Sequence, residues 1–434
     1  MSDVITSQST IDGILKTYFA GPINKAIEDQ TMLLKQLQPT SKYKVKGAKT
    51  IKHSILLVPN TSVGFRTASS DGVPNSAPSE AKQAQSVIAT LFAYIEFYGD
   101  TLRFTKDDVG AYAEAFQTEI MSCSDTMRRE INRALYGDGT GVLGLVSNAT
   151  PSTYILVGND TTNTSFAPNM RWFDRGQMLD IWDSTGSTLR YAGGFKVIAR
   201  DRTTYKLTLA LGDDATQTAI TALNGTYAVA ANDIITVRSN YKKEPYGIGA
   251  ICDNGSTINS FLGISETTYD RWRGIVSTNG ATLRALSEQI LQDHLDEVLI
   301  FDESKKNLLI MTTLKIRNKL ARLIKAAGLT IQNMQLKGGW EAIQYSGIPV
   351  YADIAAPACK LWTINTDTII PHVINDSKDD MYKFNAFSFD DEDNQVLHAV
   401  RGSDIYWCKG VLNYNFTTRN RAANGFIGDI DANL

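Results

Sequence analysis

The pattern of hydrophobic and polar positions predicts one long helix near the middle of the first half of the chain. Apolar residues recur at helical spacing from Val109 to Leu135, and Gly137 follows as a helix stop. The residues TKDD at 105–108 match a capping box before it. A helix over 105–135 would be roughly 45 Å long. This length is typical of an elongated domain with a helical spine.

Two extended segments precede this helix. Residues 42–46 read KYKVK, and this period of two predicts a strand with a basic face. Residues 87–104 favour β structure again, and the stretch between them is small and polar. We therefore expect a long hairpin over 50–104 with a polar tip at Asp71, Gly72 and Pro74. Because an isolated hairpin is only marginally stable in water, this one is expected to lie against a neighbouring chain.

After the helix the pattern changes twice. Over 150–245 the helical period disappears, and short β runs alternate with Gly, Asn, Asp and Thr. This predicts a small all-β domain, such as a barrel of five or six strands. From about 250 the pattern is mixed: we expect helices over 286–298 and 314–327, strands near 308–311 and 347–351, and two further strands over 395–418.

Composition describes an ordinary globular chain. The 434 residues are 43% hydrophobic and 21% charged, with a net charge of −3. A surface that attracts nucleic acid as a whole would be strongly basic, so any such contact must be local. The four cysteines lie far apart and form no CxxC pair, which argues against a zinc ribbon or a disulfide framework. Neither a membrane segment nor a secretory signal is visible, and we expect synthesis in a cytoplasm.

Candidate catalytic and cofactor motifs are weak. Residues 139–144 read GTGVLG and match GxGxxG, but the dinucleotide motif needs a strand before it and a helix after it. Here the order is reversed, which favours a loop that ends the helix. The acidic run at 390–394 lacks the glycine of a calcium loop. The four histidines are isolated in the sequence, and His294, beside Asp293, is interpreted as a surface residue. We therefore predict no catalytic residue, no cofactor and no metal site.

Four motifs in order resemble the major capsid proteins of tailed bacteriophages. They are INRALYGDGTGVL at 131–143, GGW at 338–340 followed by YSGIPV at 345–350, INTDT at 364–368, and TRNRAA at 418–423. The order and spacing run nearly from end to end. The N-terminal arm and the β insertion match by position only.

The resemblance implies an α+β chain with the Hong Kong 97-type capsid fold. The fold would comprise a long spine helix, an extended β-hairpin loop, axial and peripheral domains and an inserted small all-β domain. On this sequence the N-terminal arm is 1–49, the extended loop 50–104, and the spine helix with the first peripheral part 105–149. The inserted domain is 150–245, the axial domain about 246–384, and the return to the peripheral domain 385–434.

The resemblance also implies partners and a location. The family's subunits assemble as hexamers and pentamers into an icosahedral shell around double-stranded DNA. A separate scaffolding protein, a portal protein and a decoration protein would be further partners, in a virion made in bacterial cytoplasm. Some members crosslink through a lysine in the extended loop. Lys82 lies in that loop here, but no asparagine can be paired with it, so no crosslink is predicted.

The basic arm leaves three interpretations open. The first 52 residues hold eight lysines against four acidic residues, and Lys42, Lys44 and Lys46 share a strand face, with Lys49 and Lys52 after Gly47. The lysines could protect a solvated strand edge, contact acidic residues of a neighbouring subunit, or contact packaged DNA.

Two other functions compete with the phage shell. One is an encapsulin-type nanocompartment, which shares the fold but lacks a β insertion of this size. The other is an enzyme that binds a nucleotide at Gly139–Gly144, which the order of elements disfavours.

Overall fold

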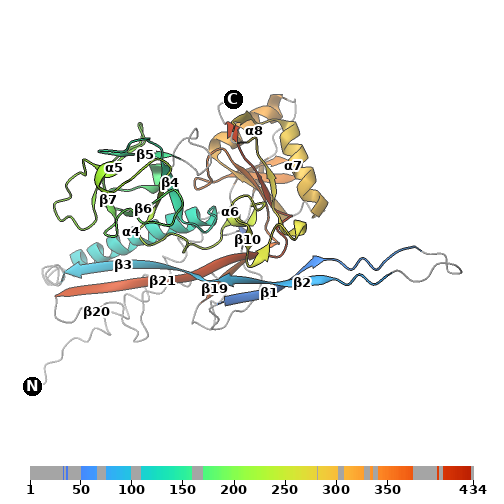
Figure 1. Cartoon of the computed structure of the whole chain (residues 1–434), viewed down its shortest axis with the longest axis horizontal. Coiled ribbons are helices and arrows are strands. Elements are labelled where there is room, and N and C mark those ends of the chain that lie inside the picture. The colour runs from blue at the N-terminus through green and yellow to red at the C-terminus, as the bar shows by residue number, and fades with distance from the viewer. Residues whose placement is uncertain are drawn as a thin grey trace, which may run out of the picture.

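The computed structural model describes a hairpin, a long sheet with one helix along it, a closed barrel and a mixed α/β lobe (Figure 1). The hairpin extends away from the other three parts along the long axis of the molecule. The described residues are 33, 36–37, 50–65, 75–98, 109–158, 170–280, 282–301, 307–326, 333–335, 341–374, 398–399 and 404–431.

The long sheet is built around the 14-residue strand β21 (Ile405–Thr418). Strand β3 (Ala89–Tyr98) pairs with it antiparallel, from Tyr98 opposite Ile405 to Ala89 opposite Tyr414. On its other edge β21 pairs with β19 (Ile369–Ile374) and β20 (His398–Ala399). Helix α4 (Val109–Leu135) packs along β3. The predicted capping box at 105–108 lies outside the described residues. Residues of one shared core come from both elements: Ala93, Ile95, Met127, Ile131 and Leu135.

The projecting hairpin is shorter than the sequence predicted. Strand β1 (Thr50–Val58) pairs antiparallel with β2 (Glu80–Val87), and only Ile88 separates β2 from β3. The chain therefore runs from the hairpin directly into the long sheet. The predicted loop over 50–104 was wrong for residues 89–98, because β3 pairs with a strand more than 300 residues away and no local pattern indicates that partner.

Six strands of the described residues close a barrel in the order β4-β5-β8-β7-β6-β9. Its buried interior comes from alternate positions, among them Leu145, Val157, Leu179 and Val197. The barrel begins with β4, before the predicted start at 150. The strands are β4 (Val142–Val146), β5 (Ile155–Gly158), β6 (Met178–Trp182), β7 (Phe195–Asp201), β8 (Lys206–Leu211) and β9 (Ile234–Val237), with η1 (Met170–Trp172) and α5 (Leu223–Thr226) between them.

The mixed lobe holds a seven-stranded sheet within the described residues, in the order β12-β22-β18-β14-β17-β16-β15. Helix α8 (Leu314–Ala326) buries Ile316, Leu320 and Ile324, which recur every four residues. Helix α7 (Glu288–Phe301) packs on β12 and β22. The strands are β12 (Ile275–Ser277), β22 (Gly425–Ile427), β18 (Leu361–Asn365), β14 (Leu308–Thr312), β17 (Ile348–Ala352), β16 (Glu341–Tyr345) and β15 (Asn333–Gln335).

The C-terminal part of the chain contributes strands to three sheets. We expected 385–434 to return to the peripheral sheet, and β21 does lie in the long sheet. The two strands after it do not: β22 joins the mixed lobe, and β23 (Ile430–Asp431) pairs with β13 (Arg284–Ala285). The expectation was wrong for these residues, because the chain turns at 419–424 and crosses into the lobe.

Candidate assembly interface

The inner face of the hairpin is buried along the paired strands β1 and β2, which we call the hairpin root. Ile51, Ile55, Leu57 and Ala84 are buried there. The backbone amide of Gln85 donates a 2.8 Å hydrogen bond to the carbonyl oxygen of Leu262. That residue lies in the turn between two short strands, β10 (Ser260–Phe261) and β11 (Ile264–Ser265). The described residues beyond β1 and β2, 59–65 and 75–79, are mostly exposed and extend away from the body of the chain (Figure 1).

The outer face and distal part of the hairpin expose apolar side chains. Leu56 is 58% exposed, Val63 87% and Phe65 fully exposed, and Val87 on β2 is also exposed. An isolated exposed leucine needs no explanation, but a row of large apolar side chains on a projecting arm is typical of a contact surface.

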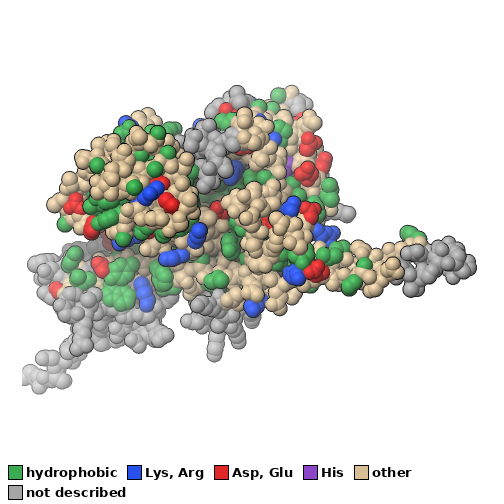
Figure 2. Space-filling model, in the orientation of Figure 1, with side chains coloured by type: hydrophobic (Ala, Val, Ile, Leu, Met, Phe, Trp, Pro, Cys, Tyr) green, Lys and Arg blue, Asp and Glu red, His purple; other side chains and the backbone are tan. Residues whose placement is uncertain are grey.

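A second apolar surface covers the outer face of the ribbon formed by β3 and β21. Phe92, Tyr94 and Tyr98 alternate along β3 and are all more than half exposed. The rings of Tyr94 and Trp407 stack with centroids 6.0 Å apart, and Lys409 Nζ lies 5.7 Å from the Trp407 ring. Hydrophobic side chains gather over this part of the molecule in Figure 2. We call this surface the aromatic ladder.

Charged groups at the hairpin root contact each other. The carboxylate of Glu80 accepts a 2.5 Å hydrogen bond from the hydroxyl of Tyr269 and lies 2.9 Å from Lys82 Nζ. The hydrogen bond from Tyr269 lowers the pKa of Glu80, and the same bond raises the pKa of Tyr269. The bond to Glu80 raises the pKa of Lys82. This carboxylate is therefore ionised at neutral pH and joins the hairpin to the segment that follows β11.

Two histidines, 319 residues apart, lie where the hairpin meets the long sheet. His53 Nε2 donates to the carbonyl oxygen of Thr418, and His372 Nε2 contacts Thr417 Oγ1 at 2.7 Å. Burial lowers the pKa of His53, and it lowers the pKa of His372 to about 4. From the sequence, both residues were interpreted as isolated. Within the described residues no cluster of His, Cys, Asp and Glu could hold a metal ion.

The structure describes two of the predicted interface residues. Lys52 and Lys82 are exposed on the hairpin, and Lys82 pairs with Glu80. The other predicted residues lie outside the described part: Asp71, Gly72 and Pro74 of the tip, and Lys42, Lys44, Lys46 and Lys49 of the arm. The acidic run at 390–394 also lies outside it.

The glycine-rich run at 139–144 follows α4 and leads into β4. Gly139 and Gly141 have φ of +89° and +76°, which favours glycine, and Thr140 binds the carboxylate of Asp138. A Cβ on Gly144 would lie 2.7 Å from the carbonyl oxygen of Gly158. The glycines thus form a tight turn and a close strand contact. This is the helix-then-strand order that disfavours a nucleotide site.

His294 is buried, not on the surface as predicted. It is 1% exposed on α7, and neither ring nitrogen has a hydrogen-bond partner. Burial lowers its pKa to about 4, with a further contribution from Arg284. In a helix, neighbouring residues point apart, so Asp293 faces outward while His294 lies on the apolar face with Leu291 and Leu295.

Buried ion pairs connect distant elements, and few of them could be predicted from the sequence. Arg133, in the last turn of α4, pairs with Glu130 and with Glu244 beyond the barrel. In the barrel, Arg190 forms a two-pronged pair with Asp233 at 2.8 Å. Arg421 in the turn after β21 pairs with Glu266. Helix α4 offers one local signal, since Glu130 and Arg133 are three residues apart.

Comparison with solved structures identifies the fold. Over 92% of this chain and 93% of the other, the structure resembles a chain of the cyanophage A-1(L) capsid asymmetric unit, with a TM-score of 0.55 and 14% sequence identity. The chain has a phage capsid fold. The α+β capsid architecture that the four sequence motifs implied is therefore confirmed at the level of the fold.

Other resemblances are weaker. A subunit of the holo-SrpI encapsulin complex from Synechococcus elongatus PCC 7942 gives a TM-score of 0.44 at 7% identity, covering 90% of this chain and 85% of the other. A chain of Mycobacterium phage Patience gives 0.43 at 11% identity, covering 100% and 90%. No protein-family model and no curated protein sequence matches the chain.

No helix in the described residues is both long and apolar enough to cross a membrane.

Proposed function

We propose that this chain is the major capsid protein of a tailed double-stranded DNA bacteriophage. The observation that carries the proposal is the capsid fold combined with two exposed apolar surfaces that a single copy leaves uncovered. In this assignment the protein is a structural subunit of the virion shell and not an enzyme. Scaffolding, portal and decoration proteins would be its partners during assembly.

The parts of the fold take their proposed roles from this assignment. The hairpin of β1 and β2 serves as the extended loop, α4 as the spine helix, and the long sheet as the peripheral domain. The mixed lobe serves as the axial domain, and the barrel is the inserted domain. The shape supports this division, because the hairpin leaves the body along the direction in which β3 and β21 run (Figure 1).

The two apolar surfaces suggest how neighbours join. The exposed row on the hairpin and the aromatic ladder lie toward opposite ends of the long axis. A contact between different surfaces of identical subunits is head-to-tail, and such contacts close into rings when the rotation between subunits permits. We place the hairpin of one copy over the ladder of the next, which would generate hexamers and pentamers.

Purification and assembly test the proposal directly. Sedimentation and electron microscopy, with and without a scaffolding partner, should give closed shells of many subunits. The double variant Leu56→Ser/Phe65→Ser should stop assembly while the subunit keeps its melting temperature. Tyr205→Asn is the matched control, since Tyr205 is an exposed aromatic on the barrel with a positive φ that asparagine tolerates.

Two outcomes contradict the proposal. A chain that stays monomeric under every condition and in infected cells would not be a shell protein. Shells that hold a cargo enzyme in place of DNA would assign the chain to a nanocompartment.

A further inference from the structure

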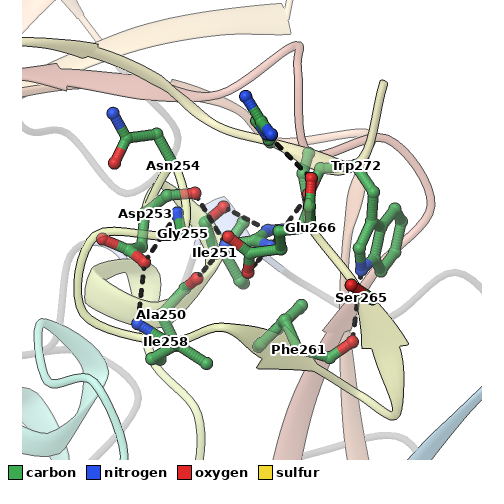
Figure 3. A network of polar contacts seen from close by, with 12 residues as sticks. Ala250, Ile251, Asp253, Asn254, Gly255, Ile258, Phe261, Ser265, Glu266 and Trp272 are labelled. Carbon is green, nitrogen blue, oxygen red and sulfur yellow. Dashed lines mark hydrogen bonds and ion pairs between the residues drawn. The ribbon is translucent and has the colours of Figure 1, made fainter. Parts of the chain in front are cut away.

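Arg421 is the most completely bonded buried charge in the described residues. It is fully buried and lies in the turn between β21 and β22. Its guanidinium has five N–H donors, and all five are used. One binds the carboxylate of Glu266, and the others bind backbone carbonyl oxygens at 2.7–3.0 Å: those of Ala250, Ile251, Asp253 and Trp272 (Figure 3).

These five acceptors all belong to one stretch of chain, residues 250–272, which we call the anchor segment. The stretch contains little regular structure: the end of the short helix α6 (Ile248–Ile251), β10, β11 and the turn η2 (Asp270–Trp272). Bonds from Arg421 reach both of its ends. The guanidinium carbon also lies 4.4 Å from the centre of the Phe261 ring. The anchor segment has no long helix or strand. The hydrogen bonds from Arg421, a residue of the C-terminal part of the chain, therefore hold it in shape.

Asp253 completes the internal bonding of the anchor segment. Its carboxylate accepts hydrogen bonds from the backbone amides of Gly255, Thr257 and Ile258, at 3.0–3.3 Å, and one from the hydroxyl of Ser256. The bonds from Arg421 and those from Asp253 together leave the segment few ways to move as a unit without breaking a buried bond.

The opposite side of the same segment supports the hairpin. Leu262 and Gly263 form the two-residue turn between β10 and β11, with φ of +53° and +80°. Leucine at positive φ is strained, and such strain persists only where the surroundings enforce it. This turn presents the carbonyl oxygen of Leu262 to the amide of Gln85 on β2. Seven residues later Tyr269 binds Glu80 at the other end of the same strand.

We propose that Arg421 is a positioning residue that sets the direction of the hairpin by fixing the anchor segment on which the hairpin root rests. A guanidinium suits this role because its five donors lie in one rigid plane. A lysine has three donors on a flexible stem and would leave two of the five acceptors unpaired. The role deepens the proposed function, since the direction of the hairpin decides how the next subunit is held.

Hydrogen exchange on the unassembled subunit tests the local effect. In Arg421→Lys we expect the amides of Glu80–Val87 to exchange at least about tenfold faster while β7 and β8 of the barrel are unchanged. Glu266→Ala removes the carboxylate acceptor and keeps the four carbonyl bonds, and it tests the proposal if Arg421→Lys fails to fold. Arg190→Lys is the matched control, because it weakens a buried Arg–carboxylate pair in the barrel and should accelerate exchange there only.

Each result of the exchange and microscopy experiments either supports or overturns the proposal. Unchanged hairpin exchange in the folded Arg421 or Glu266 variant overturns the proposal. So does acceleration of equal size throughout the chain, which would indicate a general loss of stability. In electron micrographs the variant should give shells of mixed diameter. Accelerated hairpin exchange with a single normal diameter would overturn the link to assembly. If the wild-type chain forms no shells, the proposed function fails, while the exchange comparison still decides what Arg421 does.

Discussion

The hydroxyl of Tyr269 donates a 2.5 Å hydrogen bond to the carboxylate of Glu80, 189 positions earlier in the chain. This bond holds the first residue of β2, whereas the contact between Gln85 and Leu262 holds the strand near its last residue. The hairpin is thus held at two places along β2, and the side-chain bond from Tyr269 can be removed without touching the exposed apolar row.

Tyr269→Phe removes the hydroxyl and keeps the ring. Because both partners are half-buried and stay partly open to water, we expect a modest effect: hairpin amides exchange roughly twofold to fivefold faster, and the melting temperature is unchanged. The pKa of Glu80 is below its ordinary value, so the bond contributes above about pH 4.5 and is lost as the pH falls through that lowered pKa. Tyr191→Phe is the control, since Tyr191 makes the same bond to Asp213 on the barrel. Equal acceleration in both variants would contradict the prediction.

His294 should make the subunit sensitive to acid. Its pKa is about 4 in the folded chain and about 6.5 in the unfolded chain, so the unfolded state binds more protons between these values. Stability is therefore complete above pH 6.5 and falls as the pH drops to 4, by up to about 3 kcal/mol from this residue. Denaturant unfolding of the unassembled subunit at several pH values measures the slope.

The variant His294→Leu separates this contribution from others. Leucine is similar in size, and neither ring nitrogen of His294 has a partner to lose. We expect normal stability at pH 8 and a smaller loss at pH 5 than in the wild type. His372, whose pKa is also about 4, keeps part of the slope in that variant. A slope equal to that of the wild type would show that His294 does not contribute.

The barrel should fold alone only if β4 is included. In the barrel β4 lies between β5 and β9, so its removal leaves two unpaired edges. A fragment of residues 138–245 is expected to give a β-type circular dichroism spectrum and a cooperative melt, whereas 150–245 should not. Cooperative melting of the shorter fragment would contradict the pairing of β4.

The triple variant Lys42→Gln/Lys44→Gln/Lys46→Gln distinguishes the three interpretations of the basic arm. A solvated edge predicts normal shells and normal DNA content. A subunit contact predicts defective assembly even of empty shells. A DNA contact predicts normal empty shells but filled particles that lose their genome more readily as salt is raised, because each neutralised phosphate releases counterions. Sedimentation of empty and filled particles across a salt series is the measurement.

The elements that could be predicted from the sequence are those with a local period. The apolar rows of α4 and α8 and the alternation in the barrel strands are readable because each element buries one face. The same period would have placed His294 correctly, since Leu291, His294, Leu295 and Val298 lie on one helix face. The interpretation as a surface residue gave too much weight to the neighbouring Asp293.

Long-range pairings could not be predicted in the same way. Strand β3 reads like a continuation of the hairpin, and only its pairing with β21 assigns it to the sheet. Similarly, Val142–Val146 contains a glycine that makes it resemble a loop, although Gly144 is required by the close approach of Gly158. In the candidate interface, the alternation of residues along β1 indicates which face of the hairpin is buried and which is exposed. Nothing near Arg421 in the sequence indicates that this arginine is buried.

The single residue between β2 and β3 has a mechanical consequence. A neighbour that pulls on the hairpin pulls β3 along its own length, because Ile88 alone separates the two strands and both follow the long axis. Ten residue pairs join β3 to β21. Tension in this direction loads their hydrogen bonds in shear, so they resist together and do not open one after another. In a shell linked through such strands, the outward pressure of the contents would become tension along the strands, and the hydrogen bonds between β3 and β21 would bear it together.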